Sequence, residues 1–182
     1  MAKQFDQIED AHRSFIEKQP MFFVGTAAPD GRVNVSPKGM DSLRVLGPNR
    51  ILWLNYTGSG NETAGHLRLS NRMTLMWCSF GARPMILRTY GSARTLHARD
   101  ADWADALAQF DEPYTARQIF DMQVEMVQTS CGYAVPKMDF IEDRNVLLPA
   151  MAAKPGTVED FWAERNTTTI DGMPTGVLGD DE

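Results

Sequence analysis

Short apolar or alternating runs, separated by turn residues, dominate the first part of the chain. Met21–Ala27 is a continuous apolar and β-branched run, and Arg32–Ser36 alternates, with Val33 and Val35 on one face. Ala28–Gly31, which lies between them, contains the common turn sequence Pro-Asp-Gly. The pattern predicts a β-hairpin whose second strand is half-buried.

Similar runs downstream predict more strands and favour an antiparallel barrel of about six strands. Gly91 interrupts one apolar run and indicates a bulge or a close backbone contact. Ala116–Met126 fits either a helix or a strand, and we interpret Gln118–Val127 as a strand. The remaining strands are predicted at Ser42–Leu46, Arg50–Asn55, Met73–Phe80 and Met85–Leu96.

Apolar residues at helical spacing predict helices that flank these strands. Pro20 ends the first helix, because a residue that precedes proline avoids the α region. Residues 1–150 are therefore expected to form one mainly β domain with an N-terminal helix. Residues 151–182 are expected to form a partly helical C-terminal extension, with about the last ten residues loosely held. The predicted helices are Ala2–Lys18, Glu62–Leu69, Asp100–Phe110 and Val158–Arg165.

The composition excludes several classes of partner. The 182 residues include 24 Asp and Glu against 18 Lys and Arg, and this acidic balance argues against nucleic acid. No apolar run approaches the ~20 residues needed to cross a bilayer, so we expect no membrane partner and a cytoplasmic location. Cys78 and Cys131 lie outside any CxxC spacing and are expected to be reduced. His12, His66 and His97 are isolated in the sequence, so no metal site is predicted.

The loop Thr57–Thr63 is the first candidate for binding chemistry. Its glycines allow close backbone approach, and free N–H groups at the start of the following helix favour an anion such as phosphate. The hydroxyls of Thr57, Ser59 and Thr63 add donors. The loop matches neither a Walker A nor a dinucleotide-binding motif. A plain helix cap behind a flexible loop explains the same residues, and both interpretations stay open.

The second candidate is Ser36-Pro37-Lys38-Gly39, at the end of the predicted hairpin. Pro37 has no N–H, so strand pairing is expected to stop there. Free backbone groups and Lys38 could hold a phosphate or the polar edge of a ring, although a surface lysine after a strand is the simpler interpretation. Arg88 and Arg94 share one strand face and suit phosphate, with solvated surface charges as the alternative.

Several motifs occur in an order that is typical of one family. Phe22–Gly39 ends in Val-Ser-Pro-Lys-Gly, Ile51–Leu67 contains Gly-Ser-Gly-Asn-Glu-Thr, and Arg72–Trp77 and Ile86–Gly91 follow. Together they resemble the pyridoxamine 5′-phosphate oxidase-like family, the flavin-binding split barrels. Gln128–Pro136 is similar to the C-terminal part of an uncharacterised branch of that family. The resemblance implies a six-stranded antiparallel split β-barrel and a homodimer with FMN at the subunit interface.

The resemblance also implies which residues surround the FMN. Lys38 and the backbone near Ser36 would meet the flavin ring or its ribityl chain, and Arg88, from the same chain or from the partner chain, would contribute. Glu62-Thr63 stands where the oxidases carry an Arg-Lys pair, and Ile86 stands where they carry a flavin-contacting glutamine. The C-terminal substrate-binding Arg and His pattern of the oxidases is also missing, so pyridoxamine phosphate is not the expected substrate. The implied cofactor-binding residues are Ser36, Pro37, Lys38, Gly39, Asn55, Tyr56, Thr57, Asn61, Glu62, Thr63 and Arg88.

The leading functional hypothesis is an FMN-dependent oxidoreductase that acts on an unidentified small molecule. No catalytic residue is assigned, since the flavin would carry the redox chemistry. A deazaflavin or haem in the same barrel is an alternative, with His66 or His97 as the residue to test for haem. A non-catalytic flavin-binding protein and a protein-interaction barrel are further alternatives.

Overall fold

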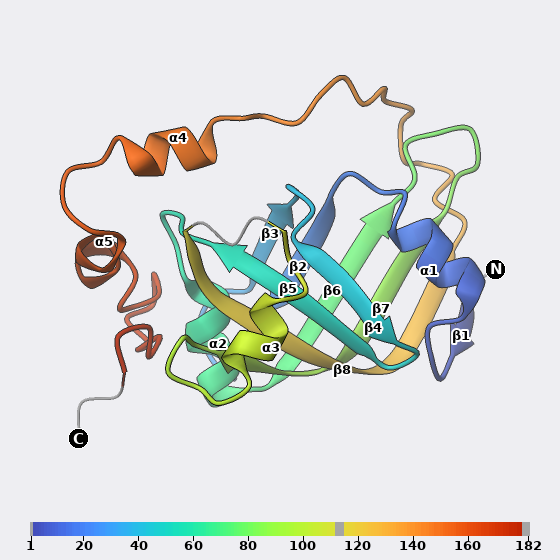
Figure 1. Ribbon diagram of the computed structural model, residues 1–182. Coiled ribbons are helices and arrows are strands. Elements are labelled where there is room, and N and C mark those ends of the chain that lie inside the picture. Colours follow the sequence, from blue (N-terminus) through green and yellow to red (C-terminus); the bar gives the residue numbers. More distant parts are fainter. Residues whose placement is uncertain (1, 112–114, 180–182) are drawn as a thin grey trace.

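A computed structural model describes residues 2–111 and 115–179 of the chain, and one antiparallel sheet dominates it (Figure 1). The strands are β1 (Lys3–Phe5), β2 (Phe22–Thr26), β3 (Asn34–Lys38), β4 (Leu43–Gly47), β5 (Arg50–Tyr56), β6 (Arg72–Cys78), β7 (Ile86–Leu96) and β8 (Ala116–Ser130). They pair in the order β3-β2-β6-β7-β8-β5-β4, and β1 pairs with β8 off this path. The mainly β antiparallel fold with flanking helices is thus confirmed.

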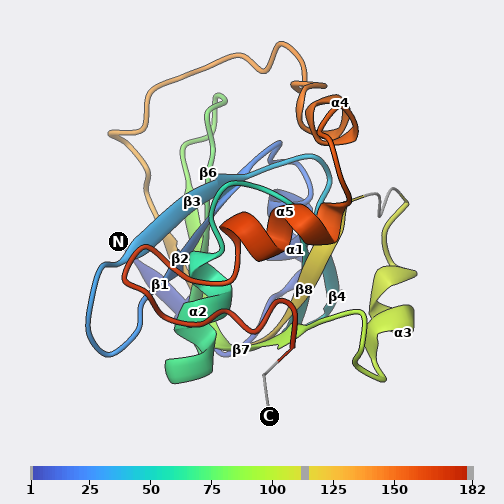
Figure 2. The same ribbon diagram turned by 90° about the vertical axis from the view of Figure 1, so that its left-hand side faces the viewer.

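The predicted number of strands is not confirmed. The sheet has eight strands rather than six, and within the described residues no pairing joins its two edges, β3 and β4. The sheet curves strongly around its core (Figures 1 and 2), as the right-handed twist of strands favours. It is therefore a curved, open sheet in the single chain.

The N-terminal prediction is wrong in its first half. Instead of one helix over Ala2–Lys18, the chain forms β1 and then α1 (Asp10–Ile16). β1 pairs with residues Val127–Thr129 of β8, and the Ile8 N–H donates to the Pro48 carbonyl at 2.7 Å. The sheet thus satisfies backbone groups that an isolated helix would have satisfied internally, and tertiary pairing overrides the helical spacing of the apolar residues.

Strand β3 continues through Pro37, contrary to the expected stop. Pro37 and Lys38 pair with Phe23 and Phe22 of β2. β3 has β2 as its single neighbour, and on an edge strand a proline can place its missing N–H on the open side. Pairing with the buried Val24 and Phe22 turns Ser36 and Lys38 inward.

The opposite face of this hairpin strand is apolar and solvent-exposed. Val33 and Val35 are 70% and 65% exposed, although both were expected on one face of a half-buried strand. The alternation is therefore as predicted, but the polar side faces the interior of the curved sheet. Such an arrangement suits a strand that lines a polar site on one side and an interface on the other.

The expectation of a bulge or close contact at Gly91 is confirmed. The register of β7 against β8 shifts between Tyr90 and Gly91. A Cβ at Gly91 would overlap the Gln123 carbonyl oxygen and lie 3.1 Å from the Val124 Cα. β8 itself is one strand of 15 residues, which confirms the strand interpretation of Gln118–Val127 and extends it at both ends.

Two apolar clusters lie on opposite sides of the sheet. Inside the curve, Trp53, Trp77 and Phe120 anchor the larger cluster. The smaller cluster includes Leu54 and Ile119 and packs the outer side of β5 and β8 against the α3 region. Apolar burial of this kind is the main favourable term in folding, so it fixes the sheet that carries the polar residues described below.

The helices close the two ends and one side of this sheet. α1 lies at one end, while α2 and α5 lie at the other, with α5 across the opening (Figure 2). The helices are α1, α2 (Glu62–Leu69), α3 (Trp103–Leu107), α4 (Leu147–Ala152) and α5 (Val158–Arg165). Both α2 and α5 begin and end as predicted, whereas α3 is shorter than Asp100–Phe110. Within residues 2–111 and 115–179, no helix is long and apolar enough to cross a bilayer.

Two residues of the C-terminal tail are buried. Thr175 is 1% exposed and Val177 is 5% exposed. That the tail as a whole is loosely held stays a prediction, and residues 180–182 lie outside the described part. Residues 131–146, by contrast, arch away from the sheet toward α4 (Figure 1).

Candidate functional site

Two cations, Lys38 and Arg117, lie close together at one end of the curved sheet, beside the loop Thr57–Asn61, and we call this region the mouth. Lys38 points inward from β3, with its Nζ 5.0 Å from the centroid of the Trp53 ring. Arg117, near the start of β8, is 4% exposed. Burial, together with the positive charge of Arg117, lowers the pKa of Lys38 to about 8. Burial also lowers the pKa of Arg117 to about 10.

Neither cation has a carboxylate partner among the residues that the structure describes. Arg117 donates to the carbonyl oxygens of Gly58 and Gly60, at 3.4 and 2.9 Å, and its Nε is buried without a partner in the described residues. Removing a charge from water is unfavourable unless the charge is paired. Two uncompensated cations that repel each other therefore mark a place built for an anion.

Amides from three segments meet beside these cations. Gln118 of β8 donates to the Asn61 Oδ1, and the Asn61 Nδ2 donates to the Asn166 carbonyl at 3.2 Å. Asn61 precedes α2 but makes no side-chain cap, because its amide is engaged in this way. Within the described residues, the buried Gln118 Oε1 and Asn166 Oδ1 lack hydrogen-bond partners. The mouth thus holds unfilled hydrogen-bonding capacity beside its positive charge.

Residues Thr157–Gly179, which we call the C-terminal strap, cover the loop that leads into α2. The Trp162 Nε1 donates to the Thr57 Oγ1 at 2.8 Å, and the Asn166 Nδ2 donates to the Gly58 carbonyl at 3.0 Å. Both carboxylate oxygens of Glu62 accept from the Ile170 N–H at 3.2 Å. The strap is therefore fastened to the loop by side chains of the strap and by side chains of the loop.

Several sequence-predicted site residues converge on the mouth. Ser36 and Lys38 face inward on β3, and Asn55 pairs with Gln118 on the same inner side. Asn55 is 5% exposed, and Asn61 is 3% exposed. Pairing and strand alternation bring these side chains together, although they come from separate parts of the chain.

Other predicted residues are present but engaged elsewhere. Thr57 is fully buried and donates its hydroxyl proton to the Thr115 carbonyl at 2.9 Å. Glu62 holds the strap through the Ile170 N–H. Thr63 is buried in α2. At the end of β3, the Gly39 carbonyl accepts a hydrogen bond from the Ser42 hydroxyl at 2.7 Å. These residues shape the loop and the strand end in the single chain.

Tyr56, Arg88 and Pro37 lie away from the mouth. Tyr56 packs with the outer cluster and lines an outer cavity of about 460 Å³ beside Phe110. Arg88 shares the outer face with Pro37, because the row of paired residues runs from Pro37 through β2 and β6 to Arg88. The Arg88 Nη1 lies 3.4 Å from the Ser130 hydroxyl. A single chain therefore does not bring Arg88 to Lys38.

Arg94, the other half of the predicted arginine pair, serves the surface. It contacts the carboxylates of Asp102 and Asp121 at 2.7 and 3.1 Å. Those hydrogen bonds raise the pKa of Arg94 above its ordinary value. The interpretation of Arg94 as a solvated strand charge is therefore the one that the structure supports.

Sequence reasoning missed Arg117, Gln118, Trp162 and Asn166. Arg117-Gln118 is a polar pair directly before the buried Ile119-Phe120, and such a pair at the start of a buried strand was an available signal. Trp162 and Asn166 carry no such signal, because they lie about a hundred residues from the loop that they contact. Only the folded chain places them.

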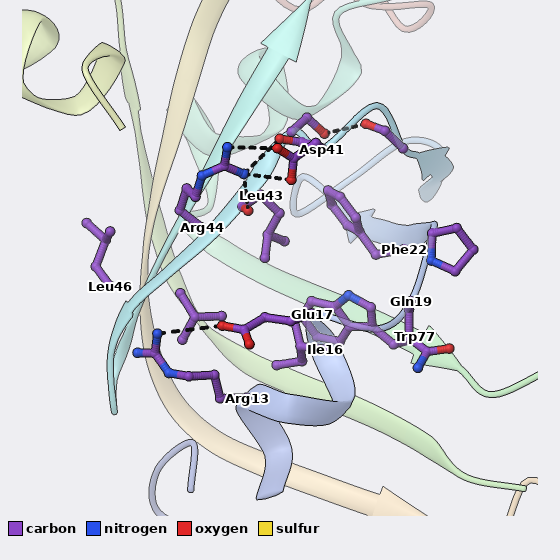
Figure 3. A pocket seen from close by; sticks show the side chains of 14 residues that line it. Arg13, Ile16, Glu17, Gln19, Phe22, Asp41, Leu43, Arg44, Leu46 and Trp77 are labelled. Carbon is purple, nitrogen blue, oxygen red and sulfur yellow. Dashed lines mark hydrogen bonds and ion pairs between the residues drawn. The ribbon is translucent and has the colours of Figure 1, made fainter. Parts of the chain in front are cut away.

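A second hollow lies between α1 and β4, beside Phe22 and Trp77 (Figure 3). It has a volume of about 260 Å³. Its arginines are already neutralised: Arg13 faces Glu17 at 3.8 Å, and Arg44 contacts Asp41 at 2.8 Å. This hollow lacks the unpaired charge of the mouth, which makes the mouth the stronger candidate for an anionic ligand.

Comparison with known proteins relates this chain to one family. Residues 8–131 match the family model described as pyridoxamine 5′-phosphate oxidase. The pyridoxamine 5′-phosphate oxidase family protein ustO of Aspergillus flavus is 32% identical over 189 residues, which cover 93% of this chain and 76% of ustO.

Solved structures support the same fold at low sequence identity. A HupZ variant from Group A Streptococcus aligns with a TM-score of 0.55 and 17% identity, over 68% of this chain and 99% of HupZ. A candidate pyridoxamine 5′-phosphate oxidase from Lactobacillus delbrueckii aligns with a TM-score of 0.54 and 19% identity, over 68% and 94% of the two chains. The family match covers more than half of the chain, so this protein belongs to the pyridoxamine 5′-phosphate oxidase-like family.

Proposed function

We propose that this protein binds FMN with its phosphate at the mouth and acts as an FMN-dependent oxidoreductase on a small molecule. The observation that carries the proposal is a pair of desolvated cations, the half-buried Lys38 and the buried Arg117, without a carboxylate partner in the described residues. A phosphate would compensate both charges. Its oxygens would also accept a charge-assisted hydrogen bond from the Arg117 Nε, which has no partner in the described residues.

The residues of the mouth fit a phosphorylated ring compound. Lys38 and Arg117 suit the phosphate, and the amides of Gln118 and Asn61 suit a polyhydroxyl chain, which both donates and accepts hydrogen bonds. Ser36 lies along the inner face of an edge strand, where a flat ring can approach the backbone. When bound, FMN supplies the redox chemistry, while the protein positions it and excludes water.

The substrate is proposed to differ from pyridoxamine phosphate. Glu62, which stands where the oxidases carry positive charge, is engaged with the strap through the Ile170 N–H. Glu62 therefore offers no cation to a phosphate, whether the phosphate belongs to the cofactor or to a substrate. We therefore expect a substrate without a phosphate at this position.

The direct test is the absorbance spectrum of the purified protein, followed by titration with FMN. We expect a flavin spectrum, or saturable binding of added FMN, and bleaching when a reduced nicotinamide is added. Mass spectrometry of the released cofactor distinguishes FMN from a deazaflavin or haem. A colourless protein that does not bind added FMN would contradict the proposal, and binding without turnover would limit it to a flavin-binding protein.

FMN affinity is expected to depend on pH through Lys38. Because the pKa of Lys38 is about 8 in the free protein, its side chain is positively charged below that pH and loses the charge above it. A bound phosphate favours the charged form and raises that pKa, so affinity should fall between these two values as pH rises, by at most tenfold per pH unit. FMN titrations across this range measure the effect. A flat profile would show that Lys38 does not contact the anion.

We also propose that the protein is a homodimer with FMN at the subunit interface. Val33 and Val35 give the edge strand β3 an exposed apolar face, and Phe140 and Ile141 on the arching segment are 60% and 89% exposed. Apolar surface of this kind is typical of protein interfaces. In such a dimer the partner's Arg88 would reach the cofactor.

Light scattering with size-exclusion chromatography tests the dimer. The wild type is expected to be dimeric, and Val33→Asp with Val35→Asp is expected to shift it toward the monomer and weaken FMN binding. A wild-type monomer that binds FMN tightly would contradict the interface site.

A further inference from the structure

The C-terminal strap is also fastened to α2, to the turn before β3 and to the segment after β7. Thr169 packs against Gly65 of α2 so closely that a Cβ on Gly65 would overlap the Thr169 Cγ2. The Asp171 carboxylate accepts from the Arg32 N–H at 2.7 Å, and Arg99 donates to the Gly176 carbonyl at 2.6 Å. The strap thus has a defined docked position over the mouth, although it lies outside the residues that match the family model.

The strap covers the mouth without neutralising it. Its Asp160 carboxylate accepts from the Thr157 N–H at 2.8 Å, its Glu164 pairs with Arg165 at 2.8 Å, and its Asp171 binds Arg32. Among the described residues, no strap carboxylate forms an ion pair with Lys38 or Arg117. A segment that imitated the ligand would bring negative charge to these cations, and this one does not.

The strap and the cations share one acceptor. The Gly58 carbonyl accepts from the Asn166 Nδ2 at 3.0 Å and from the Arg117 Nη1 at 3.4 Å. Trp162 holds the preceding residue, Thr57, through its hydroxyl. Any ligand that fixes the Arg117 guanidinium therefore also fixes the backbone on which the strap rests.

We propose that the C-terminal strap is a cover for the anion site, coupled to it through Trp162 and Asn166. The coupling rests on the proposed function, since it needs an anion at Lys38 and Arg117. A docked strap slows release of the anion, and a bound anion holds the strap down. By linkage, the gain in anion affinity that a docked strap gives equals, in free energy, the stabilisation of the docked strap by a bound anion. The strap thereby sets how long the cofactor stays bound.

The first test is the release rate of FMN from the Trp162→Phe, Asn166→Ala double variant. The changes remove the donors to Thr57 and Gly58 and keep an aromatic ring at position 162. We expect release about tenfold faster, the size of effect that two neutral hydrogen bonds give. Trp103→Phe makes the same aromatic change on α3 and should leave release unchanged.

The second test needs no change to the strap. Hydrogen exchange of residues 166–175 in the wild type is measured alone, with FMN and with inorganic phosphate. We expect either anion to slow exchange of the Thr169 and Thr175 amides, which bond to the Met173 and Thr167 carbonyls at 2.9 Å. Lys38→Met, which weakens the anion site, should lose most of this protection.

The outcomes separate this inference from the proposed function. FMN binding with unchanged strap exchange, and equal release from wild type and double variant, would overturn the cover alone. Protection by phosphate without any FMN binding would keep the cover and overturn the flavin. Faster strap exchange on binding would show that the strap is a plug which the anion displaces, and that would also overturn the cover.

Discussion

Replacing Lys38 with methionine is expected to weaken FMN binding roughly 10- to 100-fold and at the same time to stabilise the ligand-free protein. The loss of affinity is that of one charge-assisted hydrogen bond to phosphate. The gain in stability arises because a desolvated ammonium beside Arg117 is replaced by an apolar chain of similar length. We expect the free energy of unfolding to rise by about 1 kcal/mol at pH 7, within the range for removal of uncompensated buried charge.

The same variant should alter how stability depends on pH. The pKa of Lys38 is lowered from 10.5 to about 8 in the folded state, so between these values the unfolded chain binds more protons. Wild-type stability attributable to Lys38 therefore rises with pH across that window. In Lys38→Met this rise is absent, so the stability advantage of the variant over the wild type should shrink as the pH rises from about 8 toward 10.5.

Urea unfolding of both proteins at several pH values, with FMN titration at pH 7, measures these effects. Lys18→Met is the matched control, because Lys18 is exposed and should change neither quantity. A Lys38→Met protein that is less stable and binds FMN normally would show that Lys38 serves the fold. Loss of both stability and binding would leave the anion interpretation without its main support.

Replacing Gly91 with alanine is expected to be the most damaging single change in the sheet. A Cβ there would overlap the Gln123 carbonyl oxygen and lie 3.1 Å from the Val124 Cα. Both atoms belong to the backbone of β8, which is held by pairing on both sides and cannot move aside. We expect a loss of roughly 4 kcal/mol in the free energy of unfolding, a size reserved for severe steric conflicts.

Gly47→Ala provides the control for this prediction. No heavy atom lies within 4 Å of the position that a Cβ on Gly47 would take. We expect Gly47→Ala to be neutral or to stabilise the protein slightly by restricting the unfolded chain. Urea unfolding of the two variants compares them, and equal stabilities would mean that the bulge at Gly91 can rearrange.

The sequence was informative where local chemistry decides. The period-2 pattern of β3, the helical spacing of α2 and α5, and the break at Gly91 all correspond to observed elements. The N-terminus was mispredicted because Phe5 and Ile8 reach the core from a strand and a loop, at a spacing that also suits a helix. Pro37 was mispredicted as a strand end because its effect depends on whether the strand lies at a sheet edge.

By itself, the sequence determined a mainly β fold of one family, a glycine-containing loop before a short helix, and a lysine at the end of a hairpin. The tertiary structure alone decided which residues meet. The curvature of the sheet (Figure 1) brings Arg117 close to Lys38, a hydrogen bond joins Gln118 to Asn61, and the strap brings Trp162 and Asn166 onto the same loop. These residues acquire their chemistry only when they share one desolvated space, because a lysine in water keeps its ordinary pKa and a lysine inside the curved sheet does not.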